Sequence, residues 1–168
     1  MRNRYRVLAE KYELVQESTT DTLPGEQICR EFVLKCANAG SVEEVLNLTK
    51  EFKDTWDRTY PDKVVNPTAL YIITKDIDSE MFGTGYFIDL YNALYYAILS
   101  LNTQQTIDEI KKKGGKEHQL PHLEYSLVRY LKNVKRAWDK WYKVMKPYKK
   151  AQKSIAQKSK ETGINLDI

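Results

Sequence analysis

Two histidines and two cysteines carry the side chains best suited to metal binding or nucleophilic chemistry. His118 and His122 stand four positions apart, a spacing that suits two metal ligands on one helix. Pro121 lies between them, and no third Cys, Asp or Glu has a diagnostic spacing. If Cys29 and Cys36 share a helix, they lie about 10 Å apart along its axis, too far for a disulfide. We therefore expect two exposed loop histidines, free thiols and no metal ion.

Glycines and acids around position 80 form a second candidate site. Residues 83–85 (Gly-Thr-Gly) precede an apolar stretch, and their amides could cradle an anion at a helix N-terminus. They lack the Gly-Lys-Ser/Thr of a P-loop and the third glycine of a dinucleotide fingerprint, so a turn is favoured. Asp76, Asp78 and Glu80 alternate without EF-hand spacing and predict a solvated acidic loop. Asp89 falls in the first turns of the next helix, where the helix dipole favours an anion.

Charge is distributed unevenly along the chain, although the net charge is only +4. Residues 1–20 carry four basic and three acidic side chains, and residues 21–110 carry seven basic and fifteen acidic ones. Residues 111–168 carry sixteen basic and five acidic ones, and within 129–160 the only acid is Asp139. An acidic middle and a basic end indicate two surfaces that face different partners.

The basic end predicts a nucleic-acid-binding surface. Six cations form a stripe at a spacing of about 3.5 residues on one helix: Lys132, Arg136, Lys143, Lys146, Lys150 and Lys153. Like charges four apart repel each other, and the segment has almost no acids to compensate, so a partner should supply negative charge. Phosphate does so, and the excess of Lys over Arg favours backbone contacts over base reading. The alternative is docking on the acidic region 21–110 of its own or a neighbouring chain. The expected nucleic-acid-binding residues are Arg2, Arg4, Arg6, Lys132, Arg136, Lys140, Lys143, Lys146, Lys150 and Lys153.

Composition predicts the architecture that positions these residues. The chain has 168 residues, 42% hydrophobic and 30% charged, with only seven Gly and five Pro, which disfavours an all-β fold. We expect an all-α helical bundle with extended N- and C-terminal helical arms. Residues 1–20 would form a basic N-terminal helical arm, 21–115 an acidic bundle core and 116–168 a long basic C-terminal helix. The sequence shows no signal peptide and no apolar run that could span a bilayer.

Apolar periodicity and capping residues place the individual helices. They predict helices over 4–17, 24–39, 42–56, 67–74, 86–101 and 106–113. Ser41 and Glu44 form a capping box, and residues 57–66 look like a loop because of Pro61. Asn66 and Pro67 suit a helix start, although residues 69–74 also favour a strand. The nearly apolar helix 86–101 should be central, ending at residues 102–103; its expected core residues are Tyr91, Leu94, Ala97, Ile98 and Leu101.

The last predicted helix runs from Pro121 to Thr162. It carries an apolar seam at heptad spacing: Leu127, Leu131, Val134, Trp138, Trp141, Met145, Tyr148 and Ile155. Pro147 should kink or divide the helix. Forty-two helical residues span about 63 Å, longer than a compact domain of this size, so part of the helix should leave the globule or bend back.

This organisation resembles the major capsid proteins of archaeal filamentous viruses, the lipothrixvirus group. The resemblance rests on the basic start (residues 2–6), the tyrosine-rich helix 86–101 and the basic helix 138–155. It implies a helical subunit, not an enzyme, that pairs with itself or a related subunit and wraps double-stranded DNA. Its localisation would be the virion, and the host cytoplasm before assembly. The alternative is a small helical adaptor or inhibitor that binds an acidic protein surface. No residue pattern indicates an active site, a cofactor or a small-molecule substrate.

Overall fold

The computed structural model describes residues 25–162 of the chain, with side chains described for residues 25–148. The helices are α2 (Glu26–Ala37), α3 (Val42–Thr59), α4 (Pro67–Ile77), α5 (Phe87–Lys113) and α6 (Leu120–Thr162). A π-helical turn (Asp78–Phe82) follows α4, and a 3-10 turn (Glu117–Gln119) precedes α6. No strand occurs among the described residues, and the predicted all-α bundle is confirmed. The predicted helix 4–17 lies outside the described residues.

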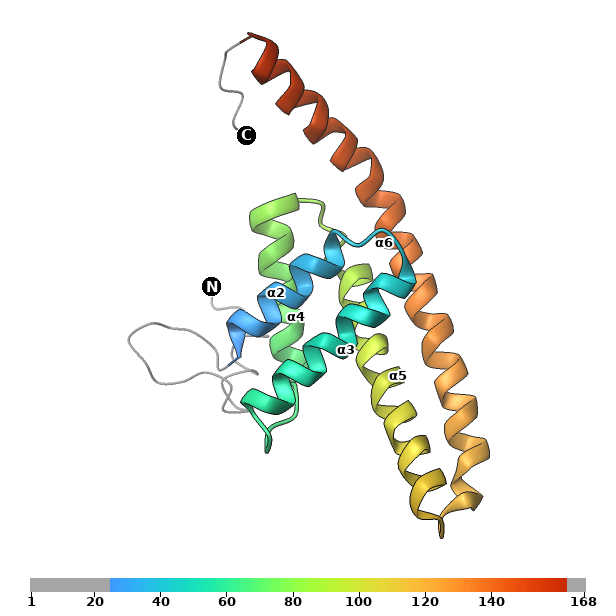
Figure 1. Cartoon of the computed structure of the whole chain (residues 1–168). Coiled ribbons are helices and arrows are strands. Elements are labelled where there is room, and N and C mark those ends of the chain that lie inside the picture. The colour runs from blue at the N-terminus through green and yellow to red at the C-terminus, as the bar shows by residue number, and fades with distance from the viewer. Residues whose placement is uncertain (1–24, 163–168) are drawn as a thin grey trace.

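An antiparallel pair of long helices, α5 and α6, forms one side of the molecule (Figure 1). These two helices share the most extensive interface in the described chain. Helix α2 packs against α3 and α4, and all three helices contact α5. Figure 1 shows that the last turns of α6 extend beyond the other helices. None of the described helices combines the length and apolar composition needed to cross a bilayer.

Local capping explains why α3 begins where the sequence predicts. The Ser41 hydroxyl accepts a hydrogen bond from the Glu44 amide at 3.2 Å. The Glu44 carboxylate accepts one in return from the Gly40 amide at 2.7 Å, one residue before the N-cap. The predicted Ser41 N-cap is therefore confirmed, while the Glu44 carboxylate bonds Gly40 and not the N-cap amide that a strict capping box uses. At its other end α3 continues to Thr59, so the loop begins at Tyr60 and not at residue 57 as predicted. Helix α2 likewise ends at Ala37, short of the predicted stop at Gly40.

Helix, not strand, is confirmed for residues 69–74. The Asn66 side chain accepts a hydrogen bond from the Thr68 amide at 2.8 Å, and Pro67 occupies the first helical position. Pro67 brings a fixed φ close to the helical value and lacks the N–H that would otherwise remain unbonded. Ile72 and Ile73 then point into the interior, so tertiary packing supports the helix despite their β preference.

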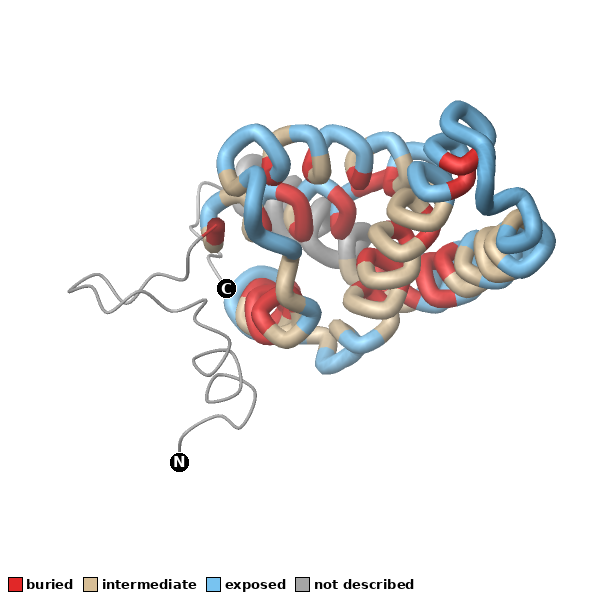
Figure 2. Tube along the Cα trace, turned by 90° about the horizontal axis from the view of Figure 1, so that it is seen from below, coloured by how far each residue is buried: buried red, intermediate tan, exposed pale blue. Residues whose placement is uncertain are grey.

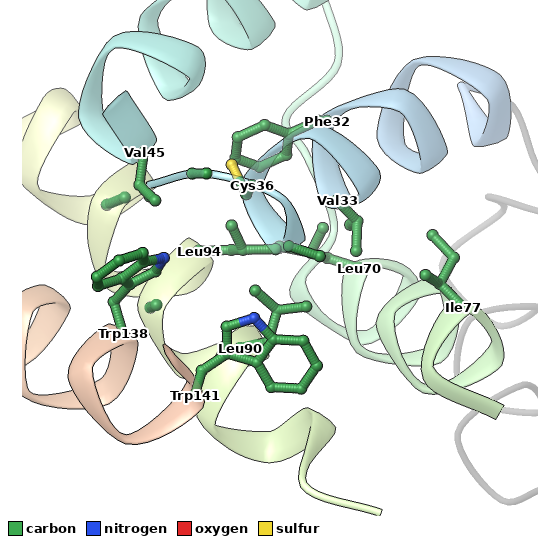
Figure 3. Packing of buried hydrophobic residues seen from close by; sticks show 14 of the residues in the cluster. Phe32, Val33, Cys36, Val45, Leu70, Ile77, Leu90, Leu94, Trp138 and Trp141 are labelled. Atoms are coloured by element: carbon green, nitrogen blue, oxygen red, sulfur yellow. The ribbon is translucent and has the colours of Figure 1, made fainter. Parts of the chain in front are cut away.

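The core combines side chains from all five described helices. Figure 2 shows buried residues on the inward sides of the helices and exposed residues on the outward sides. Figure 3 shows members of the cluster directed into one shared interior: Val33, Cys36, Val45, Leu70, Ile77, Leu90, Leu94, Trp138 and Trp141. Leu94 and Ala97 are buried as predicted. Tyr91, Ile98 and Leu101 are only half-buried, a correction, because no described helix covers the outer side of α5.

Helix α5 is longer than the sequence predicts. It runs unbroken from Phe87 to Lys113, so the predicted end at residues 102–103 and restart at Thr106 are wrong. The Thr106 hydroxyl donates a hydrogen bond to the Asn102 carbonyl at 3.0 Å within the helix. Thr106 is therefore an interior residue of α5 and not the N-cap of a new helix. Ile107 and Ile110 are buried in this second half. Packing against α6 therefore overrides the weak helix propensity of the Asn and Thr residues.

Helix α6 stays one helix through Pro147. A proline removes one backbone donor from a helix interior. Pro147 is exposed, so water can reach the carbonyl that loses its partner. At 1.5 Å per residue, the 43 residues of α6 span about 65 Å. The prediction that part of this helix leaves the globule is confirmed.

The apolar seam is buried only in its middle. Val134, Trp138, Trp141 and Met145 are all at most 5% exposed. Leu131 is 37% exposed, so the buried part of the seam stops before that turn, contrary to the prediction. The Ile155 side chain lies outside the described ones. Because this middle part enters the core cluster, the first half of α6 belongs to the bundle and only its last turns form an arm.

We expect Leu94→Ala to lower the free energy of unfolding by about 2–5 kcal/mol, since it opens a cavity in the shared core. Ile88→Ala on the same helix is the control, because Ile88 is 42% exposed, and should cost less than about 0.5 kcal/mol. Urea denaturation measures both. Equal effects of the two substitutions would show that α5 is not central to the core.

Candidate nucleic-acid interface

The polar side of α6 carries a row of five exposed cations. We call Lys132, Arg136, Lys140, Lys143 and Lys146 the cation row. At 3.6 residues per turn they lie on the side of α6 opposite Val134, Trp141 and Met145, which are buried. Among the described residues none of the five forms an ion pair. The packing that buries one side of α6 therefore presents the other side to solvent.

The one acid in this stretch of α6 is paired with a different lysine. The Asp139 carboxylate lies 3.7 Å from the Lys135 ammonium, and both side chains are more than half exposed. Exposed pairs of this kind contribute about 0–1 kcal/mol and are screened by salt. The positive charge of the cation row is therefore not neutralised inside the described chain.

The density of positive charge matches a phosphate backbone. Lys132 and Lys146 are fourteen residues apart, about 21 Å along the helix axis. Five charges over this length lie about 5 Å apart along the axis, and one DNA strand carries one phosphate per 3.4 Å of axis. A row of lysine ammonium groups on flexible stems can follow such a backbone as point charges. The geometry thus suits contact with several successive phosphates.

Docking of the basic stripe on the chain's own acidic region is disfavoured. The acidic bundle packs against the apolar side of α6, so the cation row points away from it. Acidic side chains on that bundle find other partners, as Glu80 does with Arg30 at 2.9 Å and Asp57 with Lys53 at 3.1 Å. Docking on a neighbouring chain remains a prediction that the structure of one chain does not test.

Five further predicted residues lie beyond the described side chains. Lys150 and Lys153 are on α6, within the turns that extend past the bundle, but their side chains are not described. Arg2, Arg4 and Arg6 lie outside the described residues. The structure therefore brings together the members of the cation row, and the two lysines and three arginines named in this paragraph stay predictions.

Exposed apolar side chains on α6 form a feature that the sequence analysis missed. Tyr125 is 63% exposed, Val128 51% and Tyr142 39%, on turns that also carry the cations. The Arg129 guanidinium lies 5.9 Å from the centre of the Tyr125 ring, a cation–π distance. A helical wheel of residues 125–146 would have revealed them, since none falls among the buried seam positions. The surface therefore offers apolar as well as ionic contacts.

The Gly-Thr-Gly turn does hold an anion, and that anion belongs to the chain itself. The Asp78 carboxylate accepts hydrogen bonds from the Thr84 hydroxyl at 2.6 Å, the Gly85 amide at 2.9 Å and the Thr84 amide at 3.3 Å. Asp78 is only 3% exposed. The prediction of a solvated acidic loop is therefore wrong for this residue. An aspartate shortly before a Gly-Thr-Gly is the sequence signal that would have indicated the contact.

The other candidate sites do not assemble into reactive centres. His118 and His122 are exposed as predicted, but they lie in the 3-10 turn and in α6 and not in a loop. No group of three metal-ligating side chains occurs in the described part of the chain. Cys29 and Cys36 are buried and free. Burial raises the pKa of the Cys29 thiol to about 12, with Glu26 adding to the shift. Burial also raises the pKa of Cys36, so both thiols stay protonated and unreactive.

Comparison of the chain with protein-family models, with curated proteins and with solved structures gave no match.

The internal anion should contribute to stability through its hydrogen bonds. We expect Asp78→Asn and Thr84→Val each to lower the free energy of unfolding by about 1–3 kcal/mol. Asp78→Asn replaces the carboxylate acceptor by a neutral amide, and Thr84→Val removes the hydroxyl donor. Because both act on the same contact, the double variant should lose less than the two single losses combined. Urea denaturation of the four proteins gives the coupling. Strict additivity would contradict a direct contact between these side chains.

Both thiols should resist modification in the folded protein. At pH 8 we expect no reaction of Cys29 or Cys36 with Ellman's reagent until denaturant is added. The thiol pKa is about 8.5 in an unfolded chain and is raised in the folded one, so the unfolded state loses its protons first. Their contribution to stability is thus fully present below pH 8.5 and declines as pH rises toward 12 for Cys29. Rapid modification at pH 8 without denaturant would refute this.

Proposed function

We propose that this protein binds the phosphate backbone of double-stranded DNA through α6, without sequence specificity. The supporting observation is the cation row, five exposed cations without an ion-pair partner among the described residues. Lysine outnumbers arginine four to one in it, which suits phosphate contact rather than bidentate base recognition. Lys150 and Lys153, on the projecting turns of α6, stay predicted members of the same surface.

We further propose a structural role in an assembly, as a coat subunit that packs with itself or a related subunit around DNA in a virion. The shape of α6 supports this, because its last turns leave the bundle and are available to another molecule. The exposed Tyr125, Val128 and Tyr142 add apolar area of the kind found in protein interfaces. The role needs no catalytic residue and no cofactor.

A second candidate function is that of a helical adaptor or inhibitor bound to an acidic protein surface. The same exposed tyrosines favour it, since aromatic residues among cations are typical of protein-binding hot spots. Carboxylates on a partner would then take the place of phosphates. The two functions differ in whether any duplex DNA binds with a strong dependence on salt.

Neutralising four members of the cation row should abolish most DNA binding. We expect the Lys132→Gln, Arg136→Gln, Lys143→Gln, Lys146→Gln variant to lose affinity for every duplex sequence alike, measured by fluorescence anisotropy. In the wild type log K should fall by about 0.9 per phosphate contact for each unit of log salt, and the variant slope should be shallower.

A matched control removes the same charge elsewhere. Lys35, Lys50, Arg58 and Lys63 are exposed residues of α2, α3 and the following loop, again three lysines and one arginine. Their replacement by glutamine should leave most of the binding and its salt dependence unchanged. An equal loss in both variants would indicate a general charge effect, and no loss in the first would reject the proposed interface.

Assembly should depend on DNA. In sedimentation velocity we expect the protein with duplex DNA to form species much larger than one chain on one duplex, because projecting helices link neighbouring subunits. The same measurement without DNA is the reference. A compact monomer in both conditions would argue against the coat role and favour the adaptor.

A further inference from the structure

An open apolar groove lies on the side of α5 that no described helix covers. It has a volume of about 420 Å³ and is lined by side chains of α3, the loop before α4, the start of α4, and α5. Trp56, Val65 and Leu70 form one wall, and Tyr95 and Leu99 the other. The Lys53–Asp57 ion pair lies at its rim. The groove is therefore apolar inside and polar at its edge, as binding grooves are.

The surface beside this groove is uncharged over a long distance. Between Tyr86 and Thr106 the only charged residue of α5 is Asp89, in a chain with 30% charged residues. Ile88 is 42% exposed, and Tyr95 and Leu99 are half-buried at the groove. A solvent-facing helix side normally carries charges, so this one is suited to being covered.

The described chain begins against the wall of the groove. Gly25 is buried with a φ of 77°, and a Cβ there would overlap the Trp56 ring and lie 3.3 Å from the Tyr60 ring. Trp56 itself lines the groove and donates from its indole to the Lys63 carbonyl at 2.8 Å. Gly25, the first described residue, therefore contacts a side chain that lines the groove.

We propose that residues 7–15 of the same chain dock in the groove as an amphipathic helix, with Val7, Leu8, Tyr12 and Val15 facing inward. These four positions form one apolar side of the helix that the sequence predicts over 4–17. The nine residues 16–24 can span up to about 30 Å, enough to lead back from Gly25 along the groove.

Residues 7–15 carry Lys11 together with Glu10 and Glu13, a net charge of −1, so the apolar side of the segment, and not its charge, carries the docking. Arg2, Arg4 and Arg6 precede the docked stretch and remain available for phosphate, so docking does not depend on the proposed DNA binding.

Hydrogen exchange of the full chain tests the docking. We expect amides of residues 7–15 to be protected in the wild type and to lose that protection in Leu99→Asp, which places a charge in the groove. Ile88→Asp is the matched control, on the same side of α5 but outside the groove, and should keep it. Protection in α2–α6 reports that each variant is folded. Absent protection of 7–15 in the wild type, or equal protection in both variants, overturns the proposal.

Disulfide trapping decides which chain provides the segment. We expect the Leu8→Cys, Leu99→Cys variant to form an intramolecular disulfide, seen as a monomer in which tryptic peptides containing residues 8 and 99 are linked. The Glu13→Cys, Leu99→Cys variant, with its cysteine on the opposite side of the predicted helix, should crosslink several-fold less. Cys29 and Cys36 are buried and serve as internal unreactive thiols. A covalent dimer, or equal yields from the two pairs, contradicts docking within one chain.

Discussion

Packing of the α6 seam against α5 is the interaction on which the rest of the described structure depends. Trp138 and Trp141 place two large indoles against a helix that offers Ala93 and Ala97, both 0% exposed. The small residues let the helices approach closely while the indoles fill the space between them. The indole N–H groups of both tryptophans are buried without a hydrogen-bond acceptor in the described part of the chain. Burying these two N–H groups costs desolvation free energy, which the apolar burial at the interface must offset.

The same seam determines where the charges of α6 can lie. A heptad row of buried residues at 134, 138, 141 and 145 leaves no position on that side for a lysine. Cations are consequently confined to the outer side, where successive members lie three or four residues apart. The concentration of charge is thus a geometric consequence of a sequence that is both apolar enough to pack and rich in lysine. The fold does not require the outer side of α6 to lack acids. This scarcity of acids is therefore the feature that indicates an anionic partner.

Local chemistry made much of the fold predictable, and long-range packing accounts for what was missed. The Ser41 cap and the Asn66–Pro67 start act within a few residues, so sequence reasoning placed both. The continuity of α5 depends on Ile107 and Ile110 meeting α6, which no local pattern reveals. The burial of Asp78 likewise depends on a turn folding back over it. For the candidate interface, helical periodicity was sufficient to predict the exposed cations, and the same periodicity could have placed the exposed tyrosines beside them.

Stability and binding are separable in α6. Adjacent members of the cation row repel each other by about 0.2–0.5 kcal/mol per pair, and the row contains four such pairs, so the total is about 1–2 kcal/mol. Burial of one large apolar side chain contributes about 1.5–3 kcal/mol, and four buried seam residues therefore exceed the repulsion. The helix can hold its cations in place before any partner arrives. A polyanion would then meet cations whose positions along a formed helix are already set, and its binding would relieve their mutual repulsion. Such preorganisation favours a role in which α6 binds many equivalent phosphate groups without refolding.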